Sequence, residues 1–190
     1  MKLLYVATHQ IHNLTPLFRE LSLKDKIHFK AIYWQKISSN FHDPEFNTKV
    51  NFGVDQFSGY EYFCLFDEEK STFDLSFFFK LKVIPKIIKL ILKEDFDAIV
   101  FHSYLFPNVI AAIVAKLIGK KTIMRSISYN LGKRSFIKNI IRNIYYRFSN
   151  LFIDQYWTIH KLNEDFFINF GAKKENLFFI DHCQGEYKKL

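Results

Sequence analysis

The sequence predicts a three-layer α/β fold in which a doubly wound, mostly parallel sheet lies between helices. Short apolar runs of strand length alternate with longer segments of helical period, which is the pattern of a parallel α/β sheet. Glycines follow two of the helical segments directly, where helices commonly end. Because 190 residues with 49% hydrophobic content have room for one domain with a proper core, we expect residues 1–190 to form a single domain.

The first elements can be placed from their apolar runs and punctuating residues. Residues 2–7, KLLYVA, are continuously apolar and predict a buried first strand. A helix follows with Pro16 in its first turn and with Asn13 or Thr15 as its N-cap. Residues 35–60 contain Ser, Asn, Asp, Pro and Gly without a clear period. We therefore expect a long loop there, which in a compact domain is usually functional.

The remaining elements alternate in the same way along the chain. The other helices are expected around Pro85 and at residues 107–118, 135–148 and 163–170. Gly119 and Gly171 directly follow the helices at 107–118 and 163–170 and supply their C-caps. The other strands are expected at residues 27–34, 61–66, 97–101, 121–125, 156–159 and 177–180.

Positive charge is concentrated in one part of the sequence. The net charge is +8, and no Asp or Glu occurs between Asp97 and Asp154. Such a one-signed region favours phosphates, acidic sugars, nucleic acid or anionic lipid, although a solvated basic surface explains it equally well. Basic and aromatic residues do not interleave at the spacing of RNA-binding sheets, so no nucleic-acid partner is expected.

The cysteines and the N-terminus favour a cytoplasmic setting. Cys64 and Cys183 are too few and too far apart to suggest a disulfide framework or a zinc knuckle. No signal-peptide pattern follows the first residues. The most apolar stretch, residues 83–92, is interrupted by Pro85 and two lysines and is shorter than the about 20 residues that a membrane span needs.

Polar residues cluster where three of the predicted strands end. Ligands of doubly wound sheets bind beyond the carboxyl ends of the strands, so we expect these residues to converge on one crevice. A single His at a strand end is more often a structural hydrogen-bond partner than a catalyst. The three clusters are Thr8, His9, Gln10, His12 and Asn13; His102, Ser103 and Tyr104; and Arg125, Ser126, Ser128, Tyr129 and Asn130.

Several motif-based activities are excluded. The six glycines do not form a GxGxxG or Walker loop, which argues against a dinucleotide dehydrogenase and a P-loop enzyme. No HExxH, GxSxG or Cys/His metal spacing occurs, so no metal site is expected.

The helix expected at residues 135–148 carries two stripes. The first interpretation is that its apolar stripe covers the sheet and leaves a solvated basic edge. A second interpretation makes that edge a docking site for anionic lipid or for a membrane-held acceptor. The apolar stripe is Ile137, Ile140, Ile141, Ile144 and Phe148, and the basic row is Arg134, Lys138 and Arg142.

Five segments resemble, in order, the N-terminal half of GT-B glycosyltransferases of the large family-4 type. THQIHNLTPLFREL resembles the HPIQYxxPLFR opening of that group, and FGVDQFSGYEYFCL resembles its later stretch with FG, Asp and GYxY. DFDAIVFHSY is similar to its PDAVHVHGY strand, and GKKTIMRSISYN to its GIPVLLRGESH strand and loop. FGAKKENLFFIDHC resembles LGVPEERIFFAPYCVDN, which closes the N-terminal domain in that family.

The resemblance implies a Rossmann-like GT-B half-domain that binds the acceptor, with a donor-binding domain outside this chain. By position, His102 matches the second His of HVH, which in such enzymes lies near the reacting sugar, and is the catalytic candidate. Gln10 and His12 match first-loop positions facing the cleft, and Arg125 matches the Arg of RGES. The Glu of that motif is Ile127 here, so a carboxylate that could bond an acceptor hydroxyl is missing. The expected acceptor-binding set is His9, Gln10, His12, Asn13, Tyr104, Arg125 and Ser128.

The resulting hypothesis is the acceptor-binding half of a retaining, nucleotide-sugar-dependent glycosyltransferase in cell-surface polysaccharide or glycolipid synthesis. The chain itself would hold no cofactor, and a nucleotide diphosphate sugar would be the donor once the second domain is supplied. The expected partners are a sugar or lipid-linked acceptor, a separate donor-binding subunit and an anionic membrane surface, which implies a cytoplasmic protein peripheral on the inner membrane face. The alternative is a non-catalytic adaptor that recruits an acceptor, a membrane or a partner glycosyltransferase.

Overall fold

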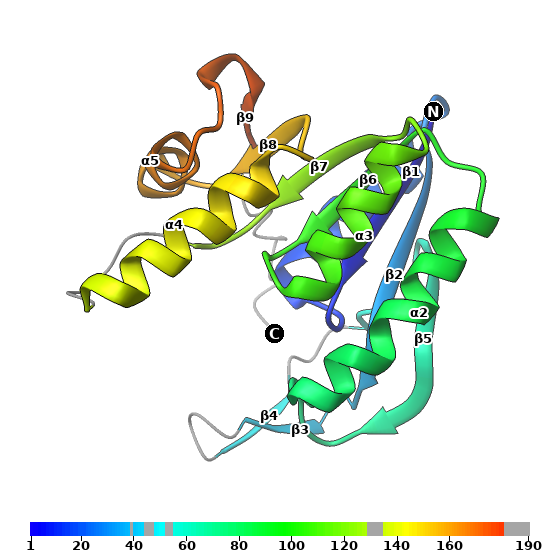
Figure 1. Cartoon of the computed structure of the whole chain (residues 1–190). Helices are drawn as coiled ribbons and strands as arrows, with labels where there is room; N and C mark the ends of the chain where they lie inside the picture. The colour runs from blue at the N-terminus through cyan, green and yellow to red at the C-terminus, as the bar shows by residue number, and fades with distance from the viewer. Residues whose placement is uncertain (39, 44–47, 52–54, 129–134, 181–190) are drawn as a thin grey trace.

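A computed structural model describes the chain except for residues 39, 44–47, 52–54, 129–134 and 181–190. Seven strands form one sheet in which every neighbouring pair is parallel, in the order β5-β2-β1-β6-β7-β8-β9 (Figure 1). The predicted doubly wound parallel sheet is confirmed. The strands are β1 Lys2–Ala7, β2 His28–Ile37, β5 Glu61–Lys70, β6 Ala98–His102, β7 Lys121–Arg125, β8 Gln155–Thr158 and β9 Leu177–Phe179.

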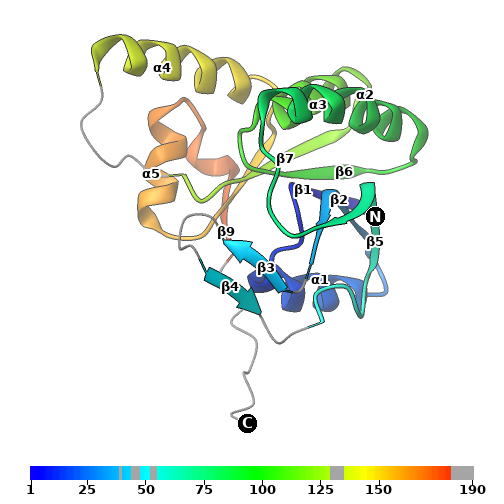
Figure 2. The same ribbon diagram turned by 90° about the horizontal axis from the view of Figure 1, so that it is seen from below.

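Helices cover both faces of the sheet and give the fold its three layers. Helix α1 packs on one face, and α2 and α3 lie side by side on the other (Figure 2). No described helix is long and apolar enough to cross a membrane. The helices are α1 Thr15–Ser22, α2 Phe77–Lys93, α3 Phe106–Leu117, α4 Phe136–Asn150 and α5 Lys161–Asn169.

Strand β1 contributes to two separate cores because successive side chains of a strand point to opposite faces. Leu4 and Val6 lie in the core beneath α2 and α3. Leu3 and Tyr5 lie in the core beneath α1. Burial on both faces explains why this strand is a continuous apolar run in the sequence.

Two sequence predictions in the first third of the chain are wrong in detail. Within the expected loop of residues 35–60, β2 continues to Ile37, and a small antiparallel hairpin follows from β3 Asn40–Asp43 and β4 Thr48–Asn51. The N-cap of α1 is Leu14, whose side chain makes no capping bond, because a 3₁₀ turn leads directly into the helix. Pro16 does occupy the first turn, as predicted.

Helix α4 does not cover the sheet with its isoleucine stripe. It extends beyond the edge of the sheet in both views (Figures 1 and 2). The whole stripe is exposed to solvent, with Ile137 at 68%. The helix is instead anchored through the aromatic ring of Tyr146, which packs at 4.8 Å from Tyr104, 5.0 Å from Phe166 and 4.8 Å from Phe170. Aromatic packing has taken the place of the predicted aliphatic contact.

The predicted basic row on α4 is also not a uniform solvated edge. The guanidinium of Arg142 lies over the rings of Tyr146, Phe166 and Phe170 at 5.1–5.4 Å and is partly buried there. Lys138 is exposed, and Arg134 lies outside the described residues.

Asp154 ties β7, β8 and α3 together. Its carboxylate accepts hydrogen bonds from the Thr122 backbone N–H at 3.0 Å and from the Thr122 hydroxyl at 3.2 Å, and it forms an ion pair with Lys116 of α3. Burial raises the pKa of Asp154, but the bonds from Lys116 and Thr122 outweigh burial and hold the pKa below its ordinary value.

Replacing Asp154 should therefore destabilise the fold measurably. We expect Asp154→Ala to lower the free energy of unfolding by about 1–3 kcal/mol, because the buried N–H of Thr122 loses its acceptor and the partly exposed ammonium of Lys116 loses its ion-pair partner. Urea titration followed by circular dichroism measures the loss. Asp165→Ala removes a solvent-exposed ion pair to Lys161 and should cost less than about 1 kcal/mol. Equal losses in the two variants would contradict a structural role for Asp154.

Candidate functional site

The order of the strands reverses between β1 and β6. β1 pairs with β2 on one side and with β6 on the other, and all strands point the same way. The connections that follow β1 and β6 therefore leave the sheet toward opposite faces, and the carboxyl edge between these two strands is where doubly wound sheets bind their ligands. His102 is the last residue of β6, and Arg125 is the last residue of β7, its neighbour.

Arg125 is a fully buried cation whose hydrogen-bonding capacity is largely unused. Arg125 is 0% exposed, and among the described residues only its Nη1 donates a hydrogen bond, a weak one of 3.4 Å to the Ile180 carbonyl. Nε and Nη2 have no hydrogen-bond partner among the described residues. An unpaired buried charge costs several kcal/mol, so this guanidinium is suited to receive an electron-rich group from elsewhere.

His102 lies beside Arg125 and is held by Tyr5. The two residues are partners in the parallel register of β6 and β7, so their side chains leave the same face. A hydrogen bond of 2.7 Å joins His102 Nδ1 and the Tyr5 hydroxyl. Burial raises the pKa of Tyr5, and the charge of Arg125 opposes this only in part, so the phenol stays neutral. The imidazole orientation is thereby fixed at the strand end.

The turn after His102 is strained and tied back by Asn108. Ser103 has φ +86, a left-handed conformation that is uncommon for a non-glycine residue. The Asn108 side chain donates to the carbonyls of His102 at 2.9 Å and Ser103 at 3.2 Å. Asn108 Oδ1 and Ser103 Oγ are buried without a partner in the described part of the chain. We call Tyr5, His102, Ser103, Asn108 and Arg125 the strand-end cluster.

The residues that follow β1 form a second, separate group. The Thr8 hydroxyl and His9 Nδ1 are joined at 2.8 Å, and the His9 ring packs on Phe73 with a centroid separation of 4.1 Å. Burial first, and the nearby His12 second, lower the pKa of His9 to about 4. Burial also lowers the pKa of His12. Both imidazoles therefore favour their neutral form at physiological pH.

Two predicted acceptor-binding residues are occupied by the fold itself. The Gln10 amide is buried, and both of its polar atoms bond to the backbone of Ile37. The Tyr104 hydroxyl is buried and donates to Asn150 Oδ1 at 2.6 Å, within the aromatic cluster beneath α4. The polar groups of both side chains therefore anchor β2 and α4, and a ligand role for Gln10 or Tyr104 stays a prediction.

The other predicted residues differ in their surroundings. Asn13 is exposed at the start of the 3₁₀ turn before α1. Ser128 is partly exposed just past β7, and its hydroxyl is 2.7 Å from that of Ser126. Ile127 between them is exposed, so an apolar side chain takes the place of the carboxylate that the resemblance leads one to expect.

Sequence reasoning missed Tyr5 and Asn108. Tyr5 lies inside an apolar strand and could not be distinguished there from a core aromatic residue. Asn108 gave a usable signal, because it is the lone uncharged polar residue in the otherwise apolar helix α3. A buried polar group in such a helix needs a partner, and here that partner is the strand-end turn.

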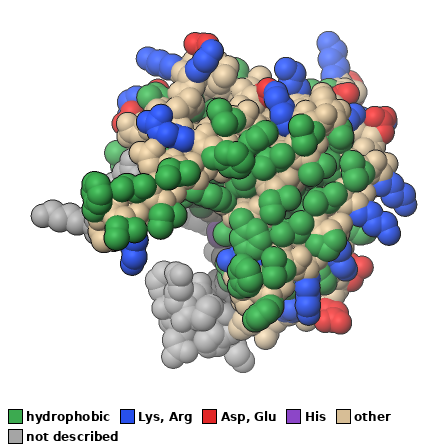
Figure 3. Space-filling model, in the orientation of Figure 1, with side chains coloured by type: hydrophobic (Ala, Val, Ile, Leu, Met, Phe, Trp, Pro, Cys, Tyr) green, Lys and Arg blue, Asp and Glu red, His purple; other side chains and the backbone are tan. Residues whose placement is uncertain are grey.

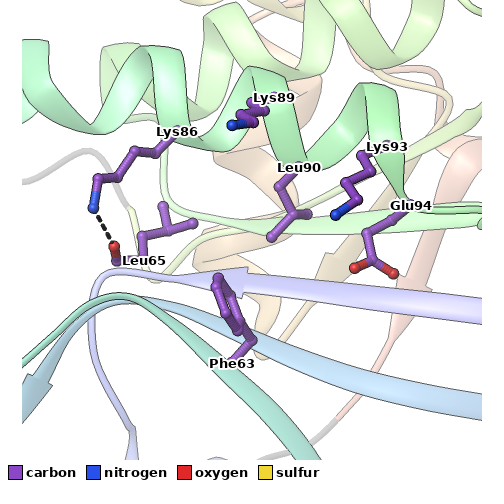
Figure 4. Close-up of a pocket in the computed structure, with 7 residues that line it drawn as sticks. All are labelled: Phe63, Leu65, Lys86, Lys89, Leu90, Lys93 and Glu94. Atoms are coloured by element: carbon purple, nitrogen blue, oxygen red, sulfur yellow. Dashed lines mark hydrogen bonds between the residues drawn. The ribbon is translucent and has the colours of Figure 1, made fainter.

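A surface groove lies away from the strand ends. It is bounded by α2 and the edge strand β5 and encloses about 350 Å³ (Figure 4). Lys86 spans the groove and donates to the Leu65 carbonyl at 2.7 Å. The groove contains no strand-end residue, so it is distinct from the candidate site. Its lining residues are Phe63, Leu65, Lys86, Lys89, Leu90, Lys93 and Glu94.

The described residues also bear on metal binding. Among them, no group of three or more His, Cys, Asp or Glu side chains is arranged to hold a metal ion. The strand-end cluster is cationic and contains no carboxylate, so its chemistry suits an anion or a polar oxygen.

Comparison with solved structures supports the fold. The UDP-GlcNAc 2-epimerase of Methanocaldococcus jannaschii is similar with TM-score 0.54 and 17% identity over 95% of this chain and 45% of that one. The Rickettsia bellii enzyme gives 0.56 and 18% over 96% and 45%, and the Neisseria meningitidis enzyme bound to UDP-GlcNAc gives 0.58 and 12% over 94% and 46%.

These enzymes have a GT-B-like Rossmann fold, and this chain spans less than half the length of each of the three. At such identities the likeness shows the fold alone. No protein-family profile matches the sequence, and no curated protein matches it.

The unused hydrogen-bonding capacity of the buried Arg125 side chain leads to a stability prediction. We expect Arg125→Met to raise the free energy of unfolding by about 1–4 kcal/mol, because an apolar side chain of similar size replaces an uncompensated buried charge. Urea titration measures the change. Arg147→Met, at an exposed arginine of α4, should change stability by less than about 1 kcal/mol. Marked destabilisation by Arg125→Met would mean that the guanidinium makes hydrogen bonds that stabilise the fold.

The lowered pKa of His9 predicts a loss of stability in acid. The unfolded chain takes up this proton near pH 6.5 and the folded chain near pH 4, so stability is fully present above pH 6.5 and falls between these values. The contribution is about 3 kcal/mol. His9→Asn keeps an acceptor for Thr8 but cannot titrate, so its unfolding free energy should fall less from neutral pH to pH 4. Equal slopes for the two proteins would refute this assignment.

Proposed function

We propose that this chain forms the acceptor-binding side of a sugar-nucleotide-dependent enzyme with two Rossmann-like lobes, specifically a retaining glycosyltransferase of cell-surface polysaccharide or glycolipid synthesis. The GT-B-like fold supports this assignment, as does the ordered series of five motif-like segments. UDP-GlcNAc is bound by a structural neighbour that is roughly twice as long as this chain. In the proposed division of labour, a donor-binding lobe would hold the diphosphate, and this lobe would hold the sugar that is extended.

The single observation that carries the proposal is the unpaired guanidinium of Arg125 beside His102. Both lie at the carboxyl edge where the strand order reverses. A bound sugar would offer hydroxyl or carboxylate oxygens to Nε and Nη2 of Arg125 and so compensate the buried charge. Charge-assisted hydrogen bonds of this kind contribute about 1.5–3 kcal/mol each.

The proposed chemistry is the transfer of a glycosyl group to an acceptor hydroxyl. Its transition state resembles an oxocarbenium ion while negative charge grows on the leaving phosphate, so catalysis depends on positioning and on stabilising that phosphate. In this lobe His102, oriented by Tyr5, would hydrogen-bond the transferred sugar. His12, which the shift in its pKa keeps neutral, would orient the acceptor, and His9, Asn13 and Ser128 would complete the acceptor side.

A non-catalytic adaptor is the second candidate. The observation in its favour is Ile127, an exposed apolar residue where the resemblance leads one to expect a carboxylate. An adaptor would use the same strand-end cluster to recruit an acceptor or a partner glycosyltransferase, without turnover of its own.

Ligand-observed NMR on the purified chain tests the proposal. In saturation-transfer experiments with a panel of neutral and acidic saccharides, we expect signals from at least one acceptor-type sugar. Arg125→Met and His102→Gln should each weaken binding about tenfold, because each removes one strong hydrogen bond. Tyr104→Phe, which alters the Asn150 contact instead, should bind like the wild type.

Three results would overturn the assignment. The first is the absence of sugar binding in the wild type. The second is tight calorimetric binding of UDP-GlcNAc by this chain alone, and the third is sugar transfer by this chain without a donor-binding lobe. Transfer restored by adding such a lobe would favour the enzyme over the adaptor.

A further inference from the structure

Three helices on one side of the molecule contain no acidic residue. Helix α2 has 17 residues, α3 has 12 and α4 has 15, and none of the three helices contains Asp or Glu. We call the solvent side of these helices the outer helical face. The nearest carboxylates in sequence, Glu94 and Asp154, are already paired with Lys30 and Lys116. The charged side chains that these three helices contribute to the face are therefore all basic.

Helix α2 has an exposed apolar stripe in addition to its buried one. Phe79, Val83, Ile87 and Ile91 face the core. On the solvent side, Phe77, Phe78, Leu81 and Leu92 are exposed, with Phe78 at 76%. Such a second stripe is not needed for the fold, because the buried stripe already docks the helix.

Lysines run along the same exposed side of α2. Lys82, Lys86, Lys89 and Lys93 recur at helical spacing, and all four are exposed. Within the described residues, Lys82, Lys89 and Lys93 form no ion pair. These three ammonium groups are therefore not held in direct ion pairs by the described residues, although the charge of Lys82 helps to lower the pKa of Asp74.

The other two helices extend this surface. The outward side of α3 is apolar, including the exposed Leu117, and α4 presents its isoleucine stripe together with Lys138 and Arg147. Hydrophobic side chains gather over α2, α3 and α4 on a single face of the molecule, with Lys and Arg around them (Figure 3). Surface apolar areas of this extent mark an interaction site.

We propose that the outer helical face binds the surface of an anionic lipid bilayer. Exposed Phe, Leu and Ile side chains would enter the boundary between headgroups and acyl chains, as they do in interfacial amphipathic helices. The lysines would reach the headgroup phosphates with their flexible stems. This inference does not depend on the sugar-binding assignment, since it uses none of the strand-end residues.

Charge argues against one other occupant of the outer helical face, and position argues against another. A second copy of the chain would bring two acid-free basic faces together, and like charges would repel each other. A donor-binding lobe would be expected opposite the carboxyl ends of the strands, whereas this face is the outside of the helical layer (Figures 1 and 2). An anionic bilayer satisfies the apolar and the basic side chains at once.

Vesicle co-sedimentation of the 190-residue chain tests the proposal. Phosphatidylcholine vesicles with and without phosphatidylglycerol are compared at low and high salt. We expect binding only to the anionic vesicles, with partial loss at high salt, because screening weakens the lysine contacts but not the apolar ones.

Two sets of substitutions separate these contributions. Reversing Lys82, Lys89 and Lys93 to Glu should reduce partitioning by about 100-fold or more. The triple variant Ile137→Gln, Ile141→Gln and Ile144→Gln keeps the charge and should lose the salt-resistant part of binding. Since all six side chains are exposed, the variants should fold, which circular dichroism verifies.

A control set reverses three exposed lysines elsewhere, Lys24, Lys26 and Lys174, and should partition like the wild type. Equal loss in this control would overturn the proposal, because it would reduce the effect to net charge. Equal wild-type binding to neutral vesicles, or no binding to anionic ones, would also overturn it. So would a dimer in sedimentation velocity that the Gln variant abolishes, since a second copy would then cover the face.

Discussion

The pairing of β1 with two parallel neighbours, β2 and β6, is the constraint on which the rest of the structure depends. Because β1 lies between them, its side chains must be apolar on both faces, and each face acquires its own core. The same pairing sends the connections after β1 and β6 to opposite faces of the sheet, so neither connection crosses the carboxyl edge between these two strands. His102 and Tyr5 meet across this pair, and Arg125 follows one strand further along. Core packing and the candidate site therefore have one common origin.

Arg125 shows how such a scaffold can hold a group that does not stabilise it. An arginine with 0% exposure, two of whose nitrogens have no hydrogen-bond partner in the described parts of the chain, is unfavourable for the fold, and the strained turn at Ser103 adds to that cost. The surrounding sheet and the Asn108 brace hold both in place. Uncompensated features that cluster at one strand end, in an otherwise well-packed sheet, are the pattern expected where stability has been exchanged for binding.

The sequence predicted most of the sheet because strands buried on both faces have a distinctive, continuously apolar composition. The strand-end rule also correctly placed His102 and Arg125 at the carboxyl ends of neighbouring strands, since it depends only on chain order. It could not find Tyr5, whose partner comes from a strand 97 residues away. It did not reveal that the Gln10 amide bonds to the backbone of Ile37. The helical periodicity of α4 predicted the wrong anchoring face, since the isoleucine stripe is exposed. That helix packs through Tyr146, and its aromatic partners come from the turn after β6 and from the end of α5, which helical spacing alone does not reveal.

The strand-end cluster and the outer helical face have a fixed position relative to each other. Neither proposed role requires this arrangement by itself. The outer helical face is parallel to the sheet, and His102 and Arg125 of the strand-end cluster lie at the carboxyl edge of that sheet. With the helices lying on a bilayer, this edge would face sideways, along the membrane surface, raised by one helix diameter (~10 Å). A soluble saccharide gains nothing from this arrangement. A sugar carried on a lipid would have its polar head presented at about that height, so the orientation favours an acceptor anchored in the same membrane.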